Sequence, residues 1–167
     1  MKKWIIISIA FLGLDQITKI LVSIYAPFKT PVPIIKGVLN IYYTHNTGVA
    51  FGLFQGITQT YTIILAIFAL VALSIFGYML VKNDFSDKKT KWYSLALALL
   101  IAGTLGNAID RLFQPGNVVI DFIDFAALGN LWGYTFNFAD VYLNVGMALL
   151  FIDIFFLEPK RKKTNYE

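Results

Sequence analysis

Two aspartates stand at the edges of apolar sequence and are the first candidates for chemistry. Asp121 lies within residues 119–123, and Asp140 stands at the start of a long apolar run. A carboxylate near hydrocarbon is costly to maintain, so such an acid is a functional candidate by default. Two acids held at the same depth can share one proton and activate a water molecule. Whether they cooperate depends on the elements that position them.

The composition is that of an integral membrane protein. Of the 167 residues, 57% are hydrophobic and 14% are charged, and the mean hydropathy is +0.66. A soluble domain carries roughly 25% charged residues, so this chain has too few charges to cover a water-facing surface. Four apolar runs approach the roughly 20 residues that a spanning helix needs. They are residues 4–25, 61–81, 92–109 and 141–157. With no repeat or low-complexity tract, residues 1–167 are interpreted as one membrane-embedded domain.

The basic residues predict the orientation in the membrane. Most of the 14 lysines and arginines lie before the first run, between the second and third, or after the fourth. The other two connections, about residues 26–60 and 110–140, hold only Lys29, Lys36 and Arg111. The positive-inside rule then places both termini in the cytoplasm and both long connections outside. The net charge of +4 reflects this bias, and no nucleic-acid partner is expected.

The residue inventory excludes several kinds of catalytic site. The chain has no cysteine and a single histidine, His45. Thiolate catalysis and thiolate metal sites are therefore excluded, as is the His-Glu-x-x-His metalloprotease motif. A Ser–His pair would have to join Ser23 to His45 without any nucleophile-elbow pattern, and we interpret His45 as a solvated or interfacial residue. A metal would need an all-oxygen site. We expect no metal and no cofactor.

The two outward connections differ in pattern. In the first, prolines at positions 27, 31 and 33 resist helix, while residues 37–44 have the partial alternation of strands. Residues 46–48 are a turn signal. Residues 49–54 are unusually apolar for a loop and are expected on the membrane surface or in an apolar groove. In the second connection, residues 118–128 are interpreted as a short amphipathic interfacial helix.

Charged residues also lie inside the first span. Asp15 and Lys19 are four residues apart, which places them on one helix face where opposite charges can pair. Ser8 lies near the same stripe, so this face is expected to point into the helix bundle. We interpret the pair mainly as an internal salt bridge that orients the first helix.

The third span combines small and polar residues. Ala98, Ala102 and Gly106 recur every fourth residue, a spacing that lets helices pack closely in lipid. Asn107 and Arg111 then gather at the outer end of the span. Arg111 can be read as the ion-pair partner of the adjacent Asp110, or as a group that holds a substrate carbonyl or organises an acidic site.

Asp140 opens the fourth span, with Asn137 just before it. An acid at a helix start is favoured by the helix dipole, which by itself would explain Asp140. The predicted topology, however, puts the outer end of the third span, Asp121 and the start of the fourth span on the same side of the membrane. The residues alone leave three acid pairs open, namely Asp121 with Asp140, Asp121 with Asp124, and Asp110 with Asp140.

Five blocks of this sequence together resemble the lipoprotein signal peptidase (signal peptidase II) family. They are residues 14–19, 46–51, 103–111, 119–123 and 136–140, in the order that the family shows. Two positions depart from the usual pattern. Val49 stands where the family usually has alanine, and Val141 stands where a small residue is common. Both are apolar neighbours of polar positions, so altered packing is expected there, with the chemistry retained.

The resemblance implies an all-α polytopic membrane protein with four transmembrane helices, a small extracytoplasmic β-element and a short interfacial helix. It implies an aspartic endopeptidase of the bacterial cell membrane, with its active site near the outer leaflet. The enzyme would cleave diacylglyceryl-modified prolipoproteins before the lipidated cysteine, among membrane lipid, and could bind acylated peptide-like inhibitors. By family match the catalytic residues are Asp121 and Asp140. The supporting or substrate-binding residues are Asp15, Asn46, Asn107, Arg111 and Asn137.

Two other classes of protein remain as alternatives. A small proton-coupled membrane transporter would use Asp15 or Asp140 as its coupling acid. Such proteins place acids near mid-membrane and often show repeat symmetry, whereas here the acids gather at the outer edge and no repeat appears. A non-enzymatic scaffold would not need clustered asparagines and aspartates. Transport of a labelled substrate by liposomes would favour the first alternative.

The charge distribution makes a topology prediction. Reporter fusions after Lys88 and after Lys162 should read as cytoplasmic, because the basic residues cluster there. Fusions near His45 and Leu128 should read as external. An external reading at Lys88 would contradict the predicted topology.

Overall fold

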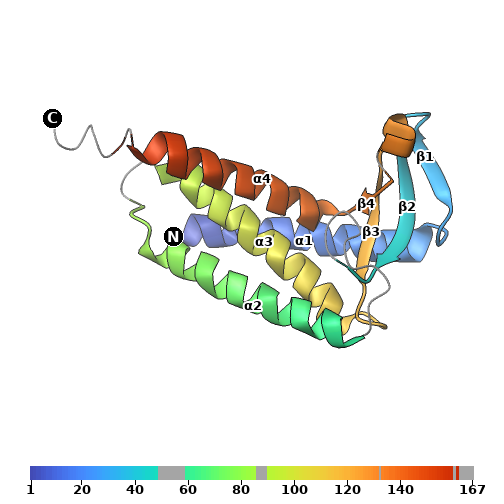
Figure 1. Cartoon of the computed structure of the whole chain (residues 1–167), viewed down its shortest axis with the longest axis horizontal. Coiled ribbons are helices and arrows are strands. Elements are labelled where there is room, and N and C mark those ends of the chain that lie inside the picture. The colour runs from blue at the N-terminus through green and yellow to red at the C-terminus, as the bar shows by residue number, and fades with distance from the viewer. Residues whose placement is uncertain (49–58, 86–89, 132, 160, 162–167) are drawn as a thin grey trace.

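The computed structural model describes residues 1–48, 59–85, 90–131, 133–159 and 161. In these residues four helices are long and apolar enough to cross a membrane. They lie side by side as a bundle with a small sheet at one end (Figure 1). The helices are α1 (Lys2–Tyr25), α2 (Gln59–Lys82), α3 (Lys91–Phe113) and α4 (Phe138–Ile152), the last continued by the π-helical turn η4 (Asp153–Leu157). All four predicted spans are confirmed, with ends that differ by a few residues.

Helix α3 is the central helix of the bundle. It packs against each of the other three, and most of its apolar stretch is buried, whereas α1, α2 and α4 are mostly exposed. The predicted line of small residues, Ala98, Ala102 and Gly106, is buried on α3. A Cβ at Gly106 would stand 2.5 Å from the Asp15 carboxylate, and one at Gly103 2.5 Å from the Ala139 carbonyl oxygen. The small residues therefore let α1 and α4 approach α3 closely.

Helix α1 has polar residues on its buried face and apolar residues on its exposed face, the reverse of a helix in a water-soluble protein. Its buried residues are all polar, namely Ser8, Asp15 and Lys19. Most of its isoleucines, such as Ile6 and Ile24, are exposed. Because a polar side chain is costly against hydrocarbon, these polar residues face the bundle and the apolar ones face lipid. The predicted Asp15–Lys19 pair is present, with Nζ 2.9 Å from Oδ2.

The sheet joins the connection between α1 and α2 to the connection between α3 and α4. It is antiparallel with the order β1 (Pro31–Ile35), β2 (Leu39–Asn46), β3 (Val119–Asp124) and β4 (Thr135–Phe136). The proline-rich strand β1 occupies an edge, where missing backbone donors are tolerated. Strand β2 confirms the predicted strand. The turn signal after it is also confirmed, since the Gly48 backbone N–H donates to Asn46 Oδ1 over 2.8 Å.

The prediction of an interfacial helix over residues 118–128 is wrong for most of that segment. Residues 119–124 form strand β3, and a short 3₁₀ helix, η3 (Ala126–Leu131), follows. Val119, Ile120 and Phe122 are buried, and β-branched and aromatic side chains suit a pleated surface. The apolar residues predicted to reach the membrane surface, 49–54, lie outside the described residues.

Close packing at Gly106 can be tested with a matched pair of variants. Gly106→Ala should lower the free energy of unfolding by about 1–3 kcal/mol, because the new methyl group must displace the Asp15 side chain. Gly77→Ala in α2 meets no atom within 4 Å and should be neutral or slightly stabilising. Thermal unfolding in detergent compares the two. Equal effects would contradict the close approach of α1 to α3.

Candidate active site

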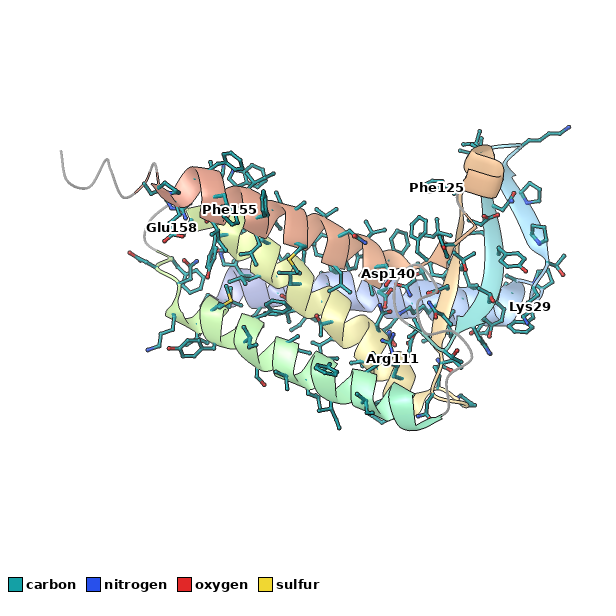
Figure 2. All side chains as sticks on the ribbon, viewed as in Figure 1. Lys29, Arg111, Phe125, Asp140, Phe155 and Glu158 are labelled. Carbon is teal, nitrogen blue, oxygen red and sulfur yellow. The ribbon has the colours of Figure 1, made fainter. Side chains whose placement is uncertain are left out.

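Asp121 and Asp140 come together where the sheet meets the helix bundle. Asp121 lies in β3 and is 1% exposed, and Asp140 lies in the first turn of α4. Figure 2 labels Asp140 and Arg111 at this junction. We call Asp121 and Asp140 the acid pair. The charge of Asp140 acts on Asp121, which supports this pairing among the three that the sequence left open.

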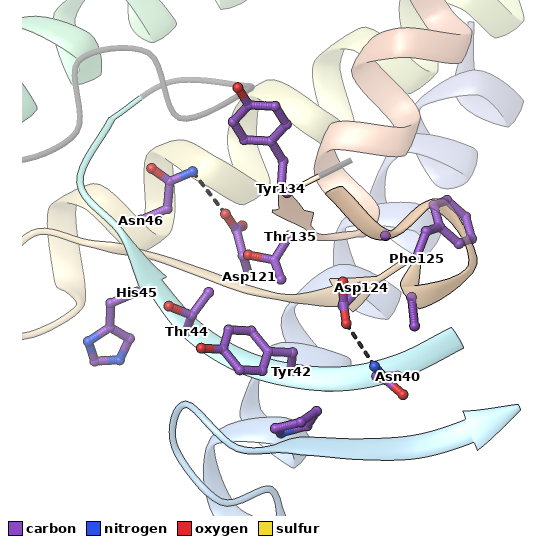
Figure 3. A pocket seen from close by; sticks show the side chains of 14 residues that line it. Asn40, Tyr42, Thr44, His45, Asn46, Asp121, Asp124, Phe125, Tyr134 and Thr135 are labelled. Atoms are coloured by element: carbon purple, nitrogen blue, oxygen red, sulfur yellow. Dashed lines mark hydrogen bonds between the residues drawn. The ribbon is translucent and has the colours of Figure 1, made fainter. Parts of the chain in front are cut away.

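Three asparagines hold the four carboxylate oxygens of the acid pair. Asp121 Oδ1 accepts from Asn137 Nδ2 over 2.7 Å. Asp121 Oδ2 accepts from Asn46 Nδ2 over 2.8 Å, the bond drawn in Figure 3. Asp140 Oδ1 accepts from Asn107 Nδ2 over 2.8 Å, and Oδ2 accepts from the Asn137 backbone N–H over 3.2 Å. Each oxygen keeps further acceptor capacity, so water or substrate can still be bound.

Asn137 has two tasks. Its side-chain oxygen accepts from the Asp140 backbone N–H over 2.9 Å, which makes it the N-cap of α4 in a reciprocal capping box with Asp140. Its amide nitrogen lies 3.1 Å from Asn107 Oδ1 and 2.7 Å from Asp121. A hydrogen-bonded path therefore runs from Asp121 through Asn137 and Asn107 to Asp140.

Lys19 of α1 holds this arrangement in place through three contacts. Its ammonium lies 2.9 Å from both Asp15 and Asp110 and donates to Asn107 Oδ1 over 3.1 Å, which uses its three donors. Because Asn107 Oδ1 accepts from Lys19, the Asn107 amide nitrogen is turned toward Asp140. The Ile120 backbone N–H also donates to Asp110. Asp110 is thus a structural partner of Lys19. This role argues against the alternative in which Asp110 and Asp140 form the catalytic pair.

Two other predicted residues support the acid pair from different sides. Asp15 accepts from the Ala139 backbone N–H over 2.8 Å, at the start of α4. Arg111 donates to the Gly48 carbonyl oxygen over 2.9 Å, so it ties the end of β2 to α3. The ion pair between Asp110 and Arg111 is not found in the described part of the chain, where the cation beside Asp110 is Lys19.

The remaining alternatives involve His45 and Asp124. His45 Nε2 lies 2.9 Å from the Tyr43 hydroxyl, and the Ser23 hydroxyl donates to the Ile20 carbonyl oxygen. The two do not form a Ser–His pair. Asp124 accepts from Asn40 Nδ2 over 2.8 Å.

Burial, followed by the charge of Asp140, raises the pKa of Asp121 from 3.8 to about 7. Hydrogen bonds from Asn46 and Asn137 oppose this shift. An acid with such a pKa can hold or release a proton near neutrality, which acid–base chemistry requires. Because the two carboxyls interact, they titrate as a unit.

Two cavities meet at the acid pair. A cavity of about 340 Å³ opens between α2, α3 and α4 and reaches Asp140, and a cavity of about 500 Å³ lies over the sheet and reaches Asp121. Asn46 borders both. The residues lining the first are mostly apolar where α2 contributes: Leu65, Phe68, Ala69 and Ala72. Among the residues that the structure describes, no three acidic or histidine side chains converge as a metal site would require.

Sequence comparisons with known proteins agree on one family. The family model for signal peptidase II matches residues 7–156. The chain is 36% identical to the lipoprotein signal peptidase of Fusobacterium nucleatum, over 96% of this chain and 91% of that protein. It is also 36% identical to that of Clostridioides difficile, over 95% and 99%. Its fold is similar to a bacterial membrane enzyme solved at 1.9 Å, with a TM-score of 0.77, 28% identity and coverage of 93% and 94%.

Reasoning from the sequence did not predict the contacts that Asp110 and Gln16 make in the site. The second partner of Lys19, Asp110, lies 91 positions away, and no local pattern predicts that contact. Gln16, within the first family block, donates to Asp110 and to the Gly106 carbonyl oxygen. Its neighbours Asp15 and Lys19 are polar in an apolar span, and that signal could have included it.

The raised pKa of Asp121 predicts a pH-dependent stability. Between pH 4 and 7 the folded state binds more protons at Asp121 than the unfolded state, so stability should fall as pH rises through this window. In Asp121→Asn this contribution is absent, and the slope of the melting temperature between pH 5 and 8 should be shallower. Thermal unfolding in detergent measures both slopes. A constant difference in melting temperature between the two proteins does not affect this test. Equal slopes of melting temperature against pH would contradict the assigned pKa of Asp121.

Proposed function

The chain belongs to the lipoprotein signal peptidase (signal peptidase II) family, and from that premise we propose that it is an aspartic endopeptidase of prolipoproteins. Its substrate is a bacterial precursor that carries diacylglyceryl on a cysteine, and the peptide bond before that cysteine is cleaved. The chain is a multi-pass membrane protein. The observation that carries the mechanism is the asparagine-held acid pair at the meeting point of two cavities.

In the proposed reaction Asp140 is the base and Asp121 the acid. Asp140 occupies the third position of α4, where the helix dipole favours a carboxylate. Asp121 has a raised pKa and keeps a proton near neutrality. Asp140 takes a proton from water, whose oxygen attacks the scissile carbonyl carbon. Asp121 donates a hydrogen bond to the carbonyl oxygen as it gains negative charge.

Collapse of the tetrahedral intermediate breaks the carbon–nitrogen bond. The proton taken up by Asp140 passes to the leaving amine, and Asp121 retains its own, so the enzyme returns to its starting state. Asn107 and Asn137 keep the two carboxyls in place through the cycle, because each accepts or donates bonds to fixed neighbours. Preorganised groups of this kind avoid reorganisation during reaction.

The cavity beside α2 suits the apolar part of such a substrate. Phe68 and Leu65 line it, and Phe68 is largely exposed on the side where a bilayer would lie. A lipidated cysteine and the end of an apolar signal peptide could therefore reach Asp140 without leaving the hydrocarbon. In this proposal the termini are cytoplasmic and the acid pair lies near the outer leaflet, as the basic residues predict.

The transporter alternative gains no support from the site. Asp15, one of its candidate coupling acids, forms an ion pair with Lys19 and accepts from the Ala139 N–H. A carboxylate so fully engaged is poorly suited to exchange protons during transport.

A cleavage assay on a diacylglyceryl-modified precursor tests the proposal. Asp121→Asn and Asp140→Asn should each lower kcat/KM by at least about 100-fold, because neither carboxyl alone can serve as both base and acid. Asp84→Asn, an exposed acid in the loop after α2, is the matched control and should keep wild-type activity. Cleavage at the control rate by either acid-pair variant would contradict the assignment.

The same assay tests whether cleavage depends on the diacylglyceryl group of the precursor. An unlipidated precursor of identical sequence should be cleaved far more slowly, since the diacylglyceryl group holds the scissile bond at the acid pair. Comparable rates for the two precursors in one detergent would leave a general membrane aspartic peptidase as the better description.

A further inference from the structure

The larger cavity, on the sheet side of Asp121, is not needed for the apolar part of the substrate. Its volume is about 500 Å³, and its wall combines strands β2 and β3 with the segment around Tyr134 (Figure 3). Polar side chains make up a substantial part of the wall, beside Phe125 and Tyr134. They are Asn40, Thr44, Asn46, Asp124 and Thr135. A cavity that begins at one acid of the pair and offers these polar groups can take the water-soluble side of a substrate.

The strands aim two acids into this cavity. On β2 every second residue from position 40 to 46 lines it, as the alternation of a strand predicts, and His45 also borders it. On β3, Asp121 and Asp124 are three apart and would face opposite sides of a regular strand, yet both line the cavity. The pairing of β2 with β3 shifts register between Ile41 and Thr44. Such irregularities re-aim side chains, and this one accounts for both acids facing the same space.

The described wall of this cavity carries negative charge and no positive charge. Asp124 is half-buried and is held by Asn40 Nδ2 at 2.8 Å. No lysine or arginine is found among the described lining residues. Burial, and then the charge of Lys29, lower the pKa of the lining residue His45, so it is largely neutral near pH 7. Beyond the acid pair itself, the wall therefore offers the negative charge of Asp124 and no compensating cation.

We propose that this cavity binds the first residues of the mature lipoprotein and that Asp124 selects among them by charge. The inference rests on the proposed function, since a peptide cut at the acid pair must extend on both sides of it. The apolar side occupies the cavity beside α2, which leaves the polar side for the cavity over the sheet. Basic and neutral side chains are favoured there, and acidic ones are disfavoured.

Strand geometry indicates which residue of the substrate lies beside Asp124. Asp124 lies three positions along β3 from Asp121, a distance of about 10 Å at roughly 3.3 Å per residue. An extended substrate running along β3 covers that distance in three residues. With the cysteine counted as the first mature residue, the third residue lies level with Asp124.

The experiment compares three lipidated precursors that differ only at the third mature residue, which is Lys, Gln or Asp. Wild-type protein should cleave the Lys precursor about three- to ten-fold faster than the Asp precursor in kcat/KM, as a partly screened charge pair allows. Added salt should shrink the ratio. Asp124→Asn, which retains an amide near Asn40, should bring the Lys-to-Asp ratio close to one. Asp84→Asn should keep the wild-type ratio.

A second variant keeps the test decisive if Asp124→Asn does not fold. Thr135→Lys adds a cation to the same wall and should shift the preference toward the Asp precursor. Equal cleavage of all three precursors by wild-type protein, or a wild-type ratio in both Asp124→Asn and Thr135→Lys, would overturn the proposed subsite while leaving the peptidase assignment intact. Failure to cleave any lipidated precursor would instead refute the proposed function itself.

Discussion

The structure depends on one buried ammonium group. Lys19 contacts Asp15, Asp110 and Asn107, and each contact leads to an element that carries a candidate acid. Asp15 accepts from the first turn of α4, Asp110 accepts from the backbone of β3 beside Asp121, and Asn107 donates to Asp140. Without the cation two carboxylates would be left buried and unpaired, at a cost of several kcal/mol. The small residues of α3 serve the same end, because Gly106 makes room for the Asp15 carboxylate.

The acid pair is held by amides, and this choice has a chemical reason. A lysine or arginine bonded directly to either carboxyl would favour its ionised form and remove the proton that the pair is proposed to share. Asparagine side chains satisfy buried oxygens without adding charge. Asn46, Asn107 and Asn137 therefore fix the geometry, while burial and mutual repulsion set the proton affinity of Asp121. The cations Lys19 and Arg111 act one step farther away.

Much of this fold could be predicted from local pattern. Length and hydropathy predict the four spans, and the Asp15–Lys19 pair follows from helix periodicity. Strand β3 could not be predicted in the same way, because about ten mixed residues fit an amphipathic helix or a strand, and the pairing with β2 across some 75 positions decides between them. The family resemblance names Asn46, Asn107 and Asn137. Which oxygen each one holds, and the register shift that turns Asp124 toward the larger cavity, depend on contacts between distant segments.

We propose that the acid pair carries one shared proton, held on Asp121 near neutral pH. Infrared spectroscopy of the carboxyl C=O stretch tests this directly, since protonated and ionised carboxyls absorb at different frequencies. A pH titration of the wild-type protein in detergent should reveal a protonated carboxyl that ionises around pH 7 and is missing from Asp121→Asn. If no carboxyl titrates in this range, or if the same signal persists in Asp121→Asn, the shared proton is not held on Asp121.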